Sequence, residues 1–315
     1  MTLLRLGTRR SPLALTQSAH VADRLRALGH DVDLVEIVTE GDRNRAALEH
    51  IGGTGVFAAA LREALREGVV DLAVHSLKDL PTAPEAGLVI GAIPWRADPR
   101  DALVARDGLT LGELPAGSRI GTGSPRRVAQ VRALGLGHDL VSIRGNVGTR
   151  LERVATGELD AVVLAKAGLD RLGLSDRITE VLDPIQVLPA AGQGALAVEC
   201  RTDDAAVRAV LAAIDDADSR AAVSAERAVL ATLEAGCTAP VGVLAEIVDD
   251  GEDTELFVRA VVAAADGTDA VRRSHTGPVD DPDRVGRALA ALLMDEIGDD
   301  LTFGIQTRHP EASAL

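Results

Sequence analysis

Short apolar runs alternate with stretches of helical spacing along the first part of the chain. LLRLG at 3–7 predicts a strand, and Ser11-Pro12 begins a helix with a capping residue and a proline at its first position. Apolar residues then recur at helical spacing until Gly29. The alternation continues with a strand at 32–38, a helix at 56–67 and a strand at 69–74. This order predicts an α/β domain with a parallel sheet.

The same alternation restarts after PWRADPRDAL at 94–103. Strands are expected near 118–121, 140–144 and 160–164, with helices from Pro125 and Val147. This is a second α/β unit. The segment 189–200 (PAAGQGALAVEC) is rich in Gly and Ala and then strand-like, and we expect it to return the chain to the first unit.

From about residue 218 the order changes. A helix at 219–235 precedes alternating strands between 241 and 275 and a final helix at 283–297. Runs of strands followed by a helix are typical of an α+β domain. The fold class expected is therefore two α/β domains and a smaller C-terminal α+β domain.

Composition narrows the functional classes. The 315 residues suit two or three domains, and no apolar run approaches the roughly 18 to 20 residues of a membrane span. A net charge of −15 and the absence of Tyr argue against a nucleic-acid partner. Two cysteines and the histidine spacing predict neither a disulfide framework nor a metal site. The N-terminal sequence lacks a secretory pattern, so we expect a cytoplasmic protein.

Four polar clusters fall where predicted strands give way to turns or helices. They are Thr8-Arg9-Arg10-Ser11, Ser76-Leu77-Lys78-Asp79, Thr122-Gly123-Ser124-Pro125-Arg126-Arg127, and Arg144-Gly145-Asn146 running to Arg150. The carboxyl edge of an open α/β sheet is where ligands bind, so clusters from two domains are expected to converge across one cleft. Three clusters begin helices, whose free N–H groups favour anions.

Arginine in the first turn of a helix opposes the helix dipole, at a cost of about 0.3 to 1 kcal/mol each when exposed. A bound polyanion offsets this cost. Lysine occurs only at 78 and 166, and the preference for arginine suggests carboxylates or phosphates held by forked hydrogen bonds. The alternative is that these arginines form surface ion pairs with the abundant Asp and Glu.

Two single residues allow a functional or an ordinary interpretation. Asp79 directly follows a buried strand, where a carboxylate can be partly desolvated and transfer protons, or can simply be a turn residue. Cys237 follows a glycine that ends a helix, so its thiol is either reachable and reactive or an unremarkable free cysteine. Cys200 lies in a strand and is expected to be buried and inert.

Read together, nine motifs resemble the porphobilinogen deaminase family in order and spacing. They are TRRSPLAL, GDR at 41–43, HSLKDLPT, IGTGSPRR, RGNVGTRL, DAVVLAKAGLDRLG, LPAAGQGA, ERA at 226–228 and LEAGCTAP. They extend from residue 5 to about 245, and beyond that the match lies in element order more than in wording.

The resemblance implies three domains, the first two like type II periplasmic binding proteins. Their expected bounds are 1–97 plus about 194–216, 98–193, and 217–315. It also implies a monomer with a dipyrromethane cofactor joined by a thioether to Cys237. Such a transferase adds four porphobilinogen molecules with loss of ammonia and releases 1-hydroxymethylbilane by hydrolysis, in tetrapyrrole and heme biosynthesis.

Site residues follow from the resemblance position by position. Asp79 is expected to face the pyrrole nitrogens and to stabilise the cation left when ammonia is lost. The other assignments are Arg9 and Ser11 for incoming substrate, Lys78, Ser124, Arg126 and Arg127 for cofactor carboxylates, and Arg144 and Arg150 for both.

The chain departs from the family at GGTGVFAAAL, where Thr54 and Ala59 stand in place of common lysines. Carboxylate contacts made there are absent or have moved. Arg43 and Arg45, in an expected mobile loop at 42–54, are the candidates to replace them.

Two other classes of protein would also need clustered arginines. One is a two-domain carboxylate-binding protein without chemistry, which has no use for Cys237. The other is a transferase that binds phosphate, but the chain has no phosphate loop of the GxxxxGK[ST] type.

Overall fold

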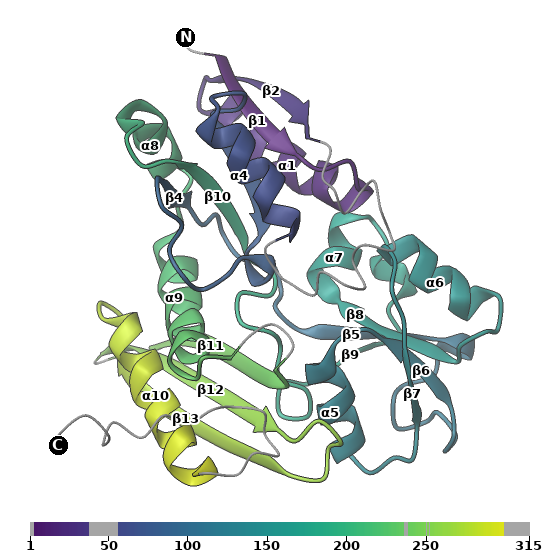
Figure 1. The fold of residues 1–315 in the computed structure, drawn as a ribbon. Coiled ribbons are helices and arrows are strands. Elements are labelled where there is room, and N and C mark those ends of the chain that lie inside the picture. The colour runs from purple at the N-terminus through teal and green to yellow at the C-terminus, as the bar shows by residue number, and fades with distance from the viewer. Residues whose placement is uncertain (1–2, 38–55, 236–238, 250, 252, 299–315) are drawn as a thin grey trace, which may run out of the picture.

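The computed structural model describes residues 3–37, 56–235, 239–249, 251 and 253–298. Within these residues the chain forms three sheets, each with its own helices. Figure 1 shows the first unit at the top, the second at the lower right and the third at the lower left.

The first sheet has five strands in the order β2-β1-β3-β10-β4. β1 runs parallel to β2 and β3, whereas β10 runs antiparallel to β3 and β4. Apolar clusters pack on both faces of this sheet: one includes Leu6, Leu25 and Leu72, and another includes Leu61, Leu65 and Ala73. The elements are β1 (Leu3–Thr8), α1 (Pro12–Ala27), β2 (Asp31–Glu36), α4 (Val56–Arg66), β3 (Leu72–Ser76), η1 (Leu77–Asp79), β4 (Leu88–Ala92), β10 (Leu196–Arg201) and α8 (Ala205–Ala212).

The second sheet also has five strands, in the order β7-β6-β8-β5-β9. β6 is parallel to β7 and β8, and β5 is antiparallel to β8 and β9. Two apolar clusters pack on its two faces. The elements are β5 (Asp101–Ala105), η2 (Arg106–Gly108), β6 (Arg119–Thr122), α5 (Pro125–Ala133), β7 (Asp139–Ser142), α6 (Val147–Ala155), β8 (Ala161–Ala165), α7 (Lys166–Arg171), η3 (Ser175–Arg177) and β9 (Glu180–Val181).

The third sheet is antiparallel, in the order β11-β12-β13, and α9 and α10 cover it. The two helices pack closely because Gly286 has no side chain; a Cβ there would lie 2.3 Å from the Ala225 carbonyl oxygen. The elements are α9 (Ala217–Thr232), β11 (Val241–Asp249), β12 (Thr254–Ala263), β13 (Ala270–Pro278) and α10 (Pro282–Ile297).

The fold class expected from the sequence is confirmed, with one correction to the sheets. They are mixed rather than parallel, because β5 and β10 enter from the neighbouring unit along the crossing segments 93–100 and 189–195, without a covering helix. The sequence did not predict β4, β5, β9, α7 and α8, and the strand predicted at 69–74 begins earlier than β3 does. No helix in the described residues is long and apolar enough to cross a membrane.

Candidate functional site

The two crossing segments meet between the first and second units. The Ala97 amide donates to the Gly194 carbonyl oxygen at 3.3 Å. Gly194 has φ +87°, and a Cβ at this position would lie 2.3 Å from the Ala97 carbonyl oxygen. Glycine is therefore required by both backbone conformation and space. This close approach fixes the neighbouring residue, Gln193, between the two sheets.

Gln193 joins a cation of the first unit to a carboxylate of the second. The Lys78 ammonium donates to its Oε1 at 3.1 Å, and its Nε2 donates to Asp101 Oδ1 at 2.8 Å and to the Pro99 carbonyl oxygen at 2.7 Å. The Gln193 side chain lies in the interior, since the residue is 1% exposed. Lys78 follows β3 in the turn η1, and Asp101 begins β5.

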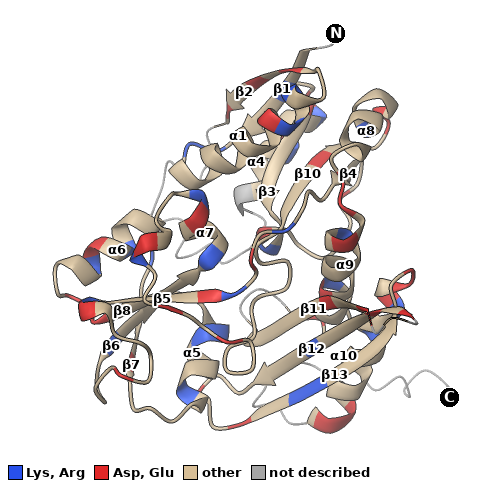
Figure 2. Cartoon of the chain, turned by 180° about the vertical axis from the view of Figure 1, so that it is seen from behind, with Lys and Arg blue, Asp and Glu red and all other residues tan. Residues whose placement is uncertain are grey.

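Asp101 also holds the two arginines that begin α5. Arg127 approaches Asp101 Oδ1 with Nη2 at 2.7 Å and Nε at 3.1 Å, and Arg126 Nη1 lies 2.8 Å from Oδ2. All three residues are buried. Burial alone raises the pKa of Asp101, but Arg126 and Arg127 hold it well below its usual range. Because Arg126, Arg127 and Arg132 fall in the first and last turns of α5, both ends of this helix are blue in Figure 2.

The local sequence explains why the arginines are placed here. Ser124 is the N-cap of α5 and Pro125 occupies its first turn. Gly123 lets the backbone after β6 lie close to the segment after β7, since a Cβ there would lie 2.6 Å from the Ile143 carbonyl oxygen. The arginines then point back to the sheet, where Arg127 Nη1 donates to the Val163 carbonyl oxygen at 2.9 Å.

Cations outnumber carboxylates in this region. Burial, and then Arg127, lower the pKa of Lys78 to about 8. Burial and Arg127 also lower the pKa of Arg150, whose Nε donates to the Gly145 carbonyl oxygen at 2.9 Å. We call the set the interdomain charge cluster: Lys78, Asp79, Asp101, Arg126, Arg127 and Arg150.

The remaining predicted residues lie at the same strand ends. Ser11 caps α1 by accepting from the Ala14 amide at 3.3 Å, and Arg9 is half-buried just after β1. Arg144 is exposed after β7. The amino-terminal part of α1 approaches the second unit, since a Cβ on Gly168 would lie 3.7 Å from Leu13. All four polar clusters thus follow strands at the expected edges.

Asp79 differs from expectation in its surroundings. The side chain is exposed, which favours the turn-residue interpretation over partial desolvation in this structure. The short turn η1 explains this, because it directs Leu77 into the core against Gly192 and leaves Asp79 on the solvent side.

Several predicted residues lie outside the described residues. They are Cys237, Thr54, Arg43 and Arg45, together with the whole of the expected loop at 42–54. Ala59 is described and lies exposed on α4. Cys200 is buried, and burial raises the pKa of its thiol to about 11, in agreement with an inert residue.

An ion pair that the sequence did not predict ties all three units together. Arg96 holds Glu226 of α9 with Nη1 at 2.7 Å and Nη2 at 3.0 Å, and Glu226 is fully buried. Glu226 also accepts from the amides of Gly192 at 2.6 Å and Ala245 at 2.9 Å. Glu226 and Gln193 both lie in motifs quoted above, ERA and LPAAGQGA, but nothing in their spacing indicates these partners.

Helix α9 is also fixed to the segment that follows Asp79. Arg227 on α9 donates to the carbonyl oxygens of Leu80 at 3.2 Å and Pro81 at 2.6 Å. In the sequence, Cys237 comes five residues after Thr232, the last residue of α9.

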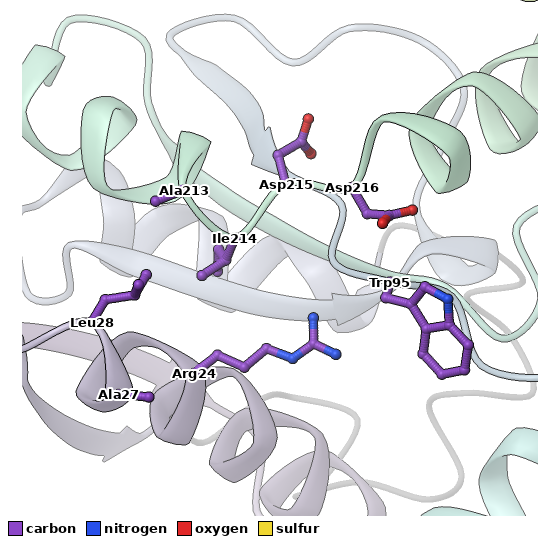
Figure 3. A pocket seen from close by; sticks show the side chains of 8 residues that line it. All are labelled: Arg24, Ala27, Leu28, Trp95, Ala213, Ile214, Asp215 and Asp216. Carbon is purple, nitrogen blue, oxygen red and sulfur yellow. The ribbon is translucent and has the colours of Figure 1, made fainter.

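Two open pockets lie elsewhere, around the exposed side chain of Trp95. One, of about 340 Å³, is lined by residues that include Arg24, Trp95 and Asp216 (Figure 3). The other, of about 250 Å³, shares Arg24 and Trp95. Neither pocket includes a residue of the interdomain charge cluster, so the cluster is defined by its ion pairs rather than by either pocket.

Two solved structures resemble part of this chain at low sequence identity. The methionine-binding protein MetQ is 14% identical with a TM-score of 0.42, over 67% of this chain and 89% of that one. A VFT2 domain of BvgS from Bordetella pertussis is 18% identical with a TM-score of 0.41, over 66% and 84%.

Three relatives named porphobilinogen deaminase match nearly the whole chain. The Mycobacterium tuberculosis protein is 55% identical over 309 residues, covering 96% of this chain and 100% of its own. The Mycobacteroides abscessus protein is 58% identical over 298 residues, covering 93% and 97%, and the Nocardia farcinica protein is 55% identical over 316 residues, covering 99% and 91%.

Family models agree with these relatives. The dipyromethane cofactor-binding domain of porphobilinogen deaminase matches residues 4–209, which include every residue of the interdomain charge cluster. The C-terminal domain of porphobilinogen deaminase matches residues 220–295. The chain belongs to the porphobilinogen deaminase family.

Proposed function

We propose that the chain joins four porphobilinogen molecules head to tail on a dipyrromethane primer attached to Cys237, and that the interdomain charge cluster holds the primer. The activity is that of its family, a porphobilinogen deaminase of tetrapyrrole biosynthesis. One observation carries the assignment of the site: four cations from two units gather around only two carboxylates.

The donors of the cluster fit a polycarboxylate cofactor. Each pyrrole ring carries an acetate and a propionate, so a dipyrromethane brings four carboxylates. Arg126 Nε is buried and has no hydrogen-bond partner among the described residues. A buried donor of this kind is costly unless a ligand accepts its proton. When bound, the cofactor supplies the nucleophilic α-carbon and a covalent anchor.

Each residue then has a task that its position supports. Lys78, Arg126 and Arg127 neutralise carboxylates of the primer, with Ser124 at the start of α5 as a further donor. Arg9 and Ser11, at the end of β1, receive the incoming substrate. Arg144 and Arg150 serve both as the product grows.

Asp79 is the catalytic carboxylate of this proposal. It lies beside Lys78 at the end of β3, where a negative charge stabilises the cation formed as ammonia leaves. The same carboxylate accepts the proton released when two rings have been joined. Its exposure leaves it accessible to substrate.

The domain bounds belong to the same proposal. Domain 1 comprises 1–97 and about 194–216, domain 2 comprises 98–193, and domain 3 comprises 217–315. Membership of the strands in the three sheets supports this division, with β10 returning to the first sheet. Location in the cytoplasm and a monomeric state are further predictions for this enzyme.

The first test is the denatured intact mass of the purified full chain beside its Cys237→Ser variant. We expect an adduct the size of two linked pyrroles on the wild type, and none on the variant. Incubation of the wild type with porphobilinogen should also release ammonia, which a binding protein without chemistry would not produce. An unmodified mass that persists after this incubation would overturn the proposal.

A further inference from the structure

Gln193 is held in one orientation by charges of opposite sign at its two ends. Its oxygen faces the Lys78 ammonium, and its nitrogen faces the Asp101 carboxylate. Turning the amide over would place the oxygen against a carboxylate and the nitrogen against an ammonium. The surrounding charges therefore fix which end of the amide is which.

The side chain has no spare donor and its backbone is clamped. Nε2 uses its two hydrogens on Asp101 and on the Pro99 carbonyl oxygen. The Gln193 carbonyl oxygen accepts from Arg96 Nε at 2.8 Å. The next residue is the glycine that touches Ala97. The amide is therefore a spacer of fixed length between Lys78 and Asp101.

This spacer sets where the first unit's cation stands relative to the second unit's arginines. Asp101 binds Arg126 and Arg127 directly, so the chain of contacts runs from Lys78 through Gln193 to both guanidinium groups. The two arginines repel the Lys78 ammonium, whereas Asp79 and Asp101 attract it. Among the described residues, Gln193 Oε1 is the acceptor that holds Lys78 Nζ by a hydrogen bond.

We infer that Gln193 is a positioning residue that holds the Lys78 ammonium at a fixed distance from Arg126 and Arg127, so that both units grip one polyanion. The inference rests on the proposed function, because it concerns the same cluster. Gln193 itself need not touch the substrate; it acts through Lys78.

The chain offers a direct probe, because Lys78 and Lys166 are its only lysines. Protein labelled with ¹³C and ¹⁵N in lysine gives two side-chain resonances by NMR. A Lys166→Arg variant assigns them, and Lys166, whose ion pairs are with Asp98 and Asp170, serves as the internal control. The titration uses the full chain in a Cys237→Ser background, so that no covalent primer competes for Lys78.

Two variants of similar side-chain length have opposite expected effects on Lys78. Gln193→Glu places an anion beside the ammonium and should raise the pKa of Lys78 by about one unit, from about 8. Gln193→Met removes the acceptor and should lower the pKa by a similar amount. The Lys166 resonance should behave alike in all three proteins.

Turnover, measured with Cys237 intact, provides the second readout. Gln193→Met loses the hydrogen bonds to Lys78 and Asp101, and Gln193→Glu loses the donor to Asp101 and sets a second carboxylate beside it. Both variants should therefore reduce kcat by about tenfold or more. Because Lys78 must stay protonated to hold a carboxylate, kcat should fall as pH rises through its pKa. The alkaline limb should therefore move up in Gln193→Glu and down in Gln193→Met, which a purely structural role would not produce.

The outcomes separate the two proposals. Equal Lys78 titrations in wild type and both variants would overturn the role of Gln193. The proposed function would still stand if the wild type turns over porphobilinogen normally. If the two variants shift the Lys78 pKa in opposite directions but the wild type releases no ammonia from porphobilinogen, the role of Gln193 is upheld and the proposed function is refuted. If the buried charge prevents Gln193→Glu from folding, Gln193→Met still decides, because an unchanged Lys78 titration in that variant contradicts the inference.

Discussion

Two guanidinium groups share one carboxylate at the start of α5, and this arrangement combines the two interpretations of the arginine clusters. Arg126 and Arg127 do form ion pairs, but with the buried Asp101 rather than with surface acids. One carboxylate cannot neutralise two cations, so positive charge remains for a ligand. The Asp101 pairs thus preorganise the arginines instead of competing with the cofactor.

Replacement of Asp101 by Asn should destabilise the protein by about 3 to 5 kcal/mol, because two buried guanidinium groups lose their counter-ion. Chemical denaturation measures this change. Asp203→Asn, at an exposed residue without a side-chain partner among the described residues, is the control and should be nearly neutral. Equal stability of the Asp101 variant and the wild type would contradict this role.

The same ion pairs predict an acid-dependent stability. The folded pKa of Asp101 lies below its unfolded value of about 3.9, so its contribution is fully present above that value. It is lost as pH falls from about 4 through the depressed folded pKa. The difference in unfolding free energy between wild type and Asp101→Asn should therefore shrink in acid.

Asp79→Asn tests the catalytic assignment at the same scale. Because Asp79 is exposed, the variant should fold and retain the primer adduct seen by mass spectrometry. Turnover should fall by about a hundredfold or more, as expected when a charged acid–base group is lost. Near-normal turnover with an intact adduct would refute the assignment.

Local sequence signals predicted helix starts better than strand directions. Pro125 and Val147 begin α5 and α6 as expected, because capping residues and proline act within one turn. β3 begins at Leu72, later than expected, since Gly68 adopts a positive φ and the chain turns before entering the sheet. Whether a strand pairs parallel or antiparallel depends on the direction from which the chain enters the sheet. The local hydrophobic periodicity does not contain this information.

The candidate site was predictable only in part, for the same reason. The arginine, serine and lysine positions stand in motifs at strand ends and were found there. Gln193 and Glu226 were not recognised, because their partners lie far away in the chain: Gln193 meets Lys78 and Glu226 meets Arg96. Contacts of this kind appear only when the units have assembled.

Gly194→Ala tests the close approach of the two crossing segments, 93–100 and 189–195. The new methyl group would clash with the Ala97 carbonyl oxygen and also stand at a positive φ. We expect a loss of more than about 2 kcal/mol in unfolding free energy and a clear fall in turnover, because Gln193 moves with its neighbour. Gly157→Ala has φ +74° but open space around it, so it isolates the backbone strain of about 1 kcal/mol. Equal losses in the two variants would show that the close approach is unimportant.

The three units depend on one buried ion pair. Arg96 stands on a crossing segment, Glu226 on α9, and Glu226 also accepts from the amides of Gly192 and Ala245. A single carboxylate therefore links all three units. A substitution at Glu226 should therefore lower the stability of all three units rather than of one.

Glu226→Gln should lower the unfolding free energy by about 3 kcal/mol, because the largely covered guanidinium group of Arg96 is left without a counter-ion. Thermal unfolding followed by calorimetry should show a lower Tm and a broader transition as the units separate. The control is Glu234→Gln, at an exposed turn residue just past the end of α9, which should leave the transition unchanged. A single sharp transition at the wild-type Tm would contradict this link.

The position of β10 between β3 and β4 has a consequence for synthesis on the ribosome. The strands of the second sheet, from β5 to β9, are contiguous in the chain and are all made before β10 emerges. The unit translated first is therefore completed later than the one translated after it. Until β10 arrives, β3 and β4 expose unpaired backbone edges, which makes the nascent chain a natural client for chaperones during that interval.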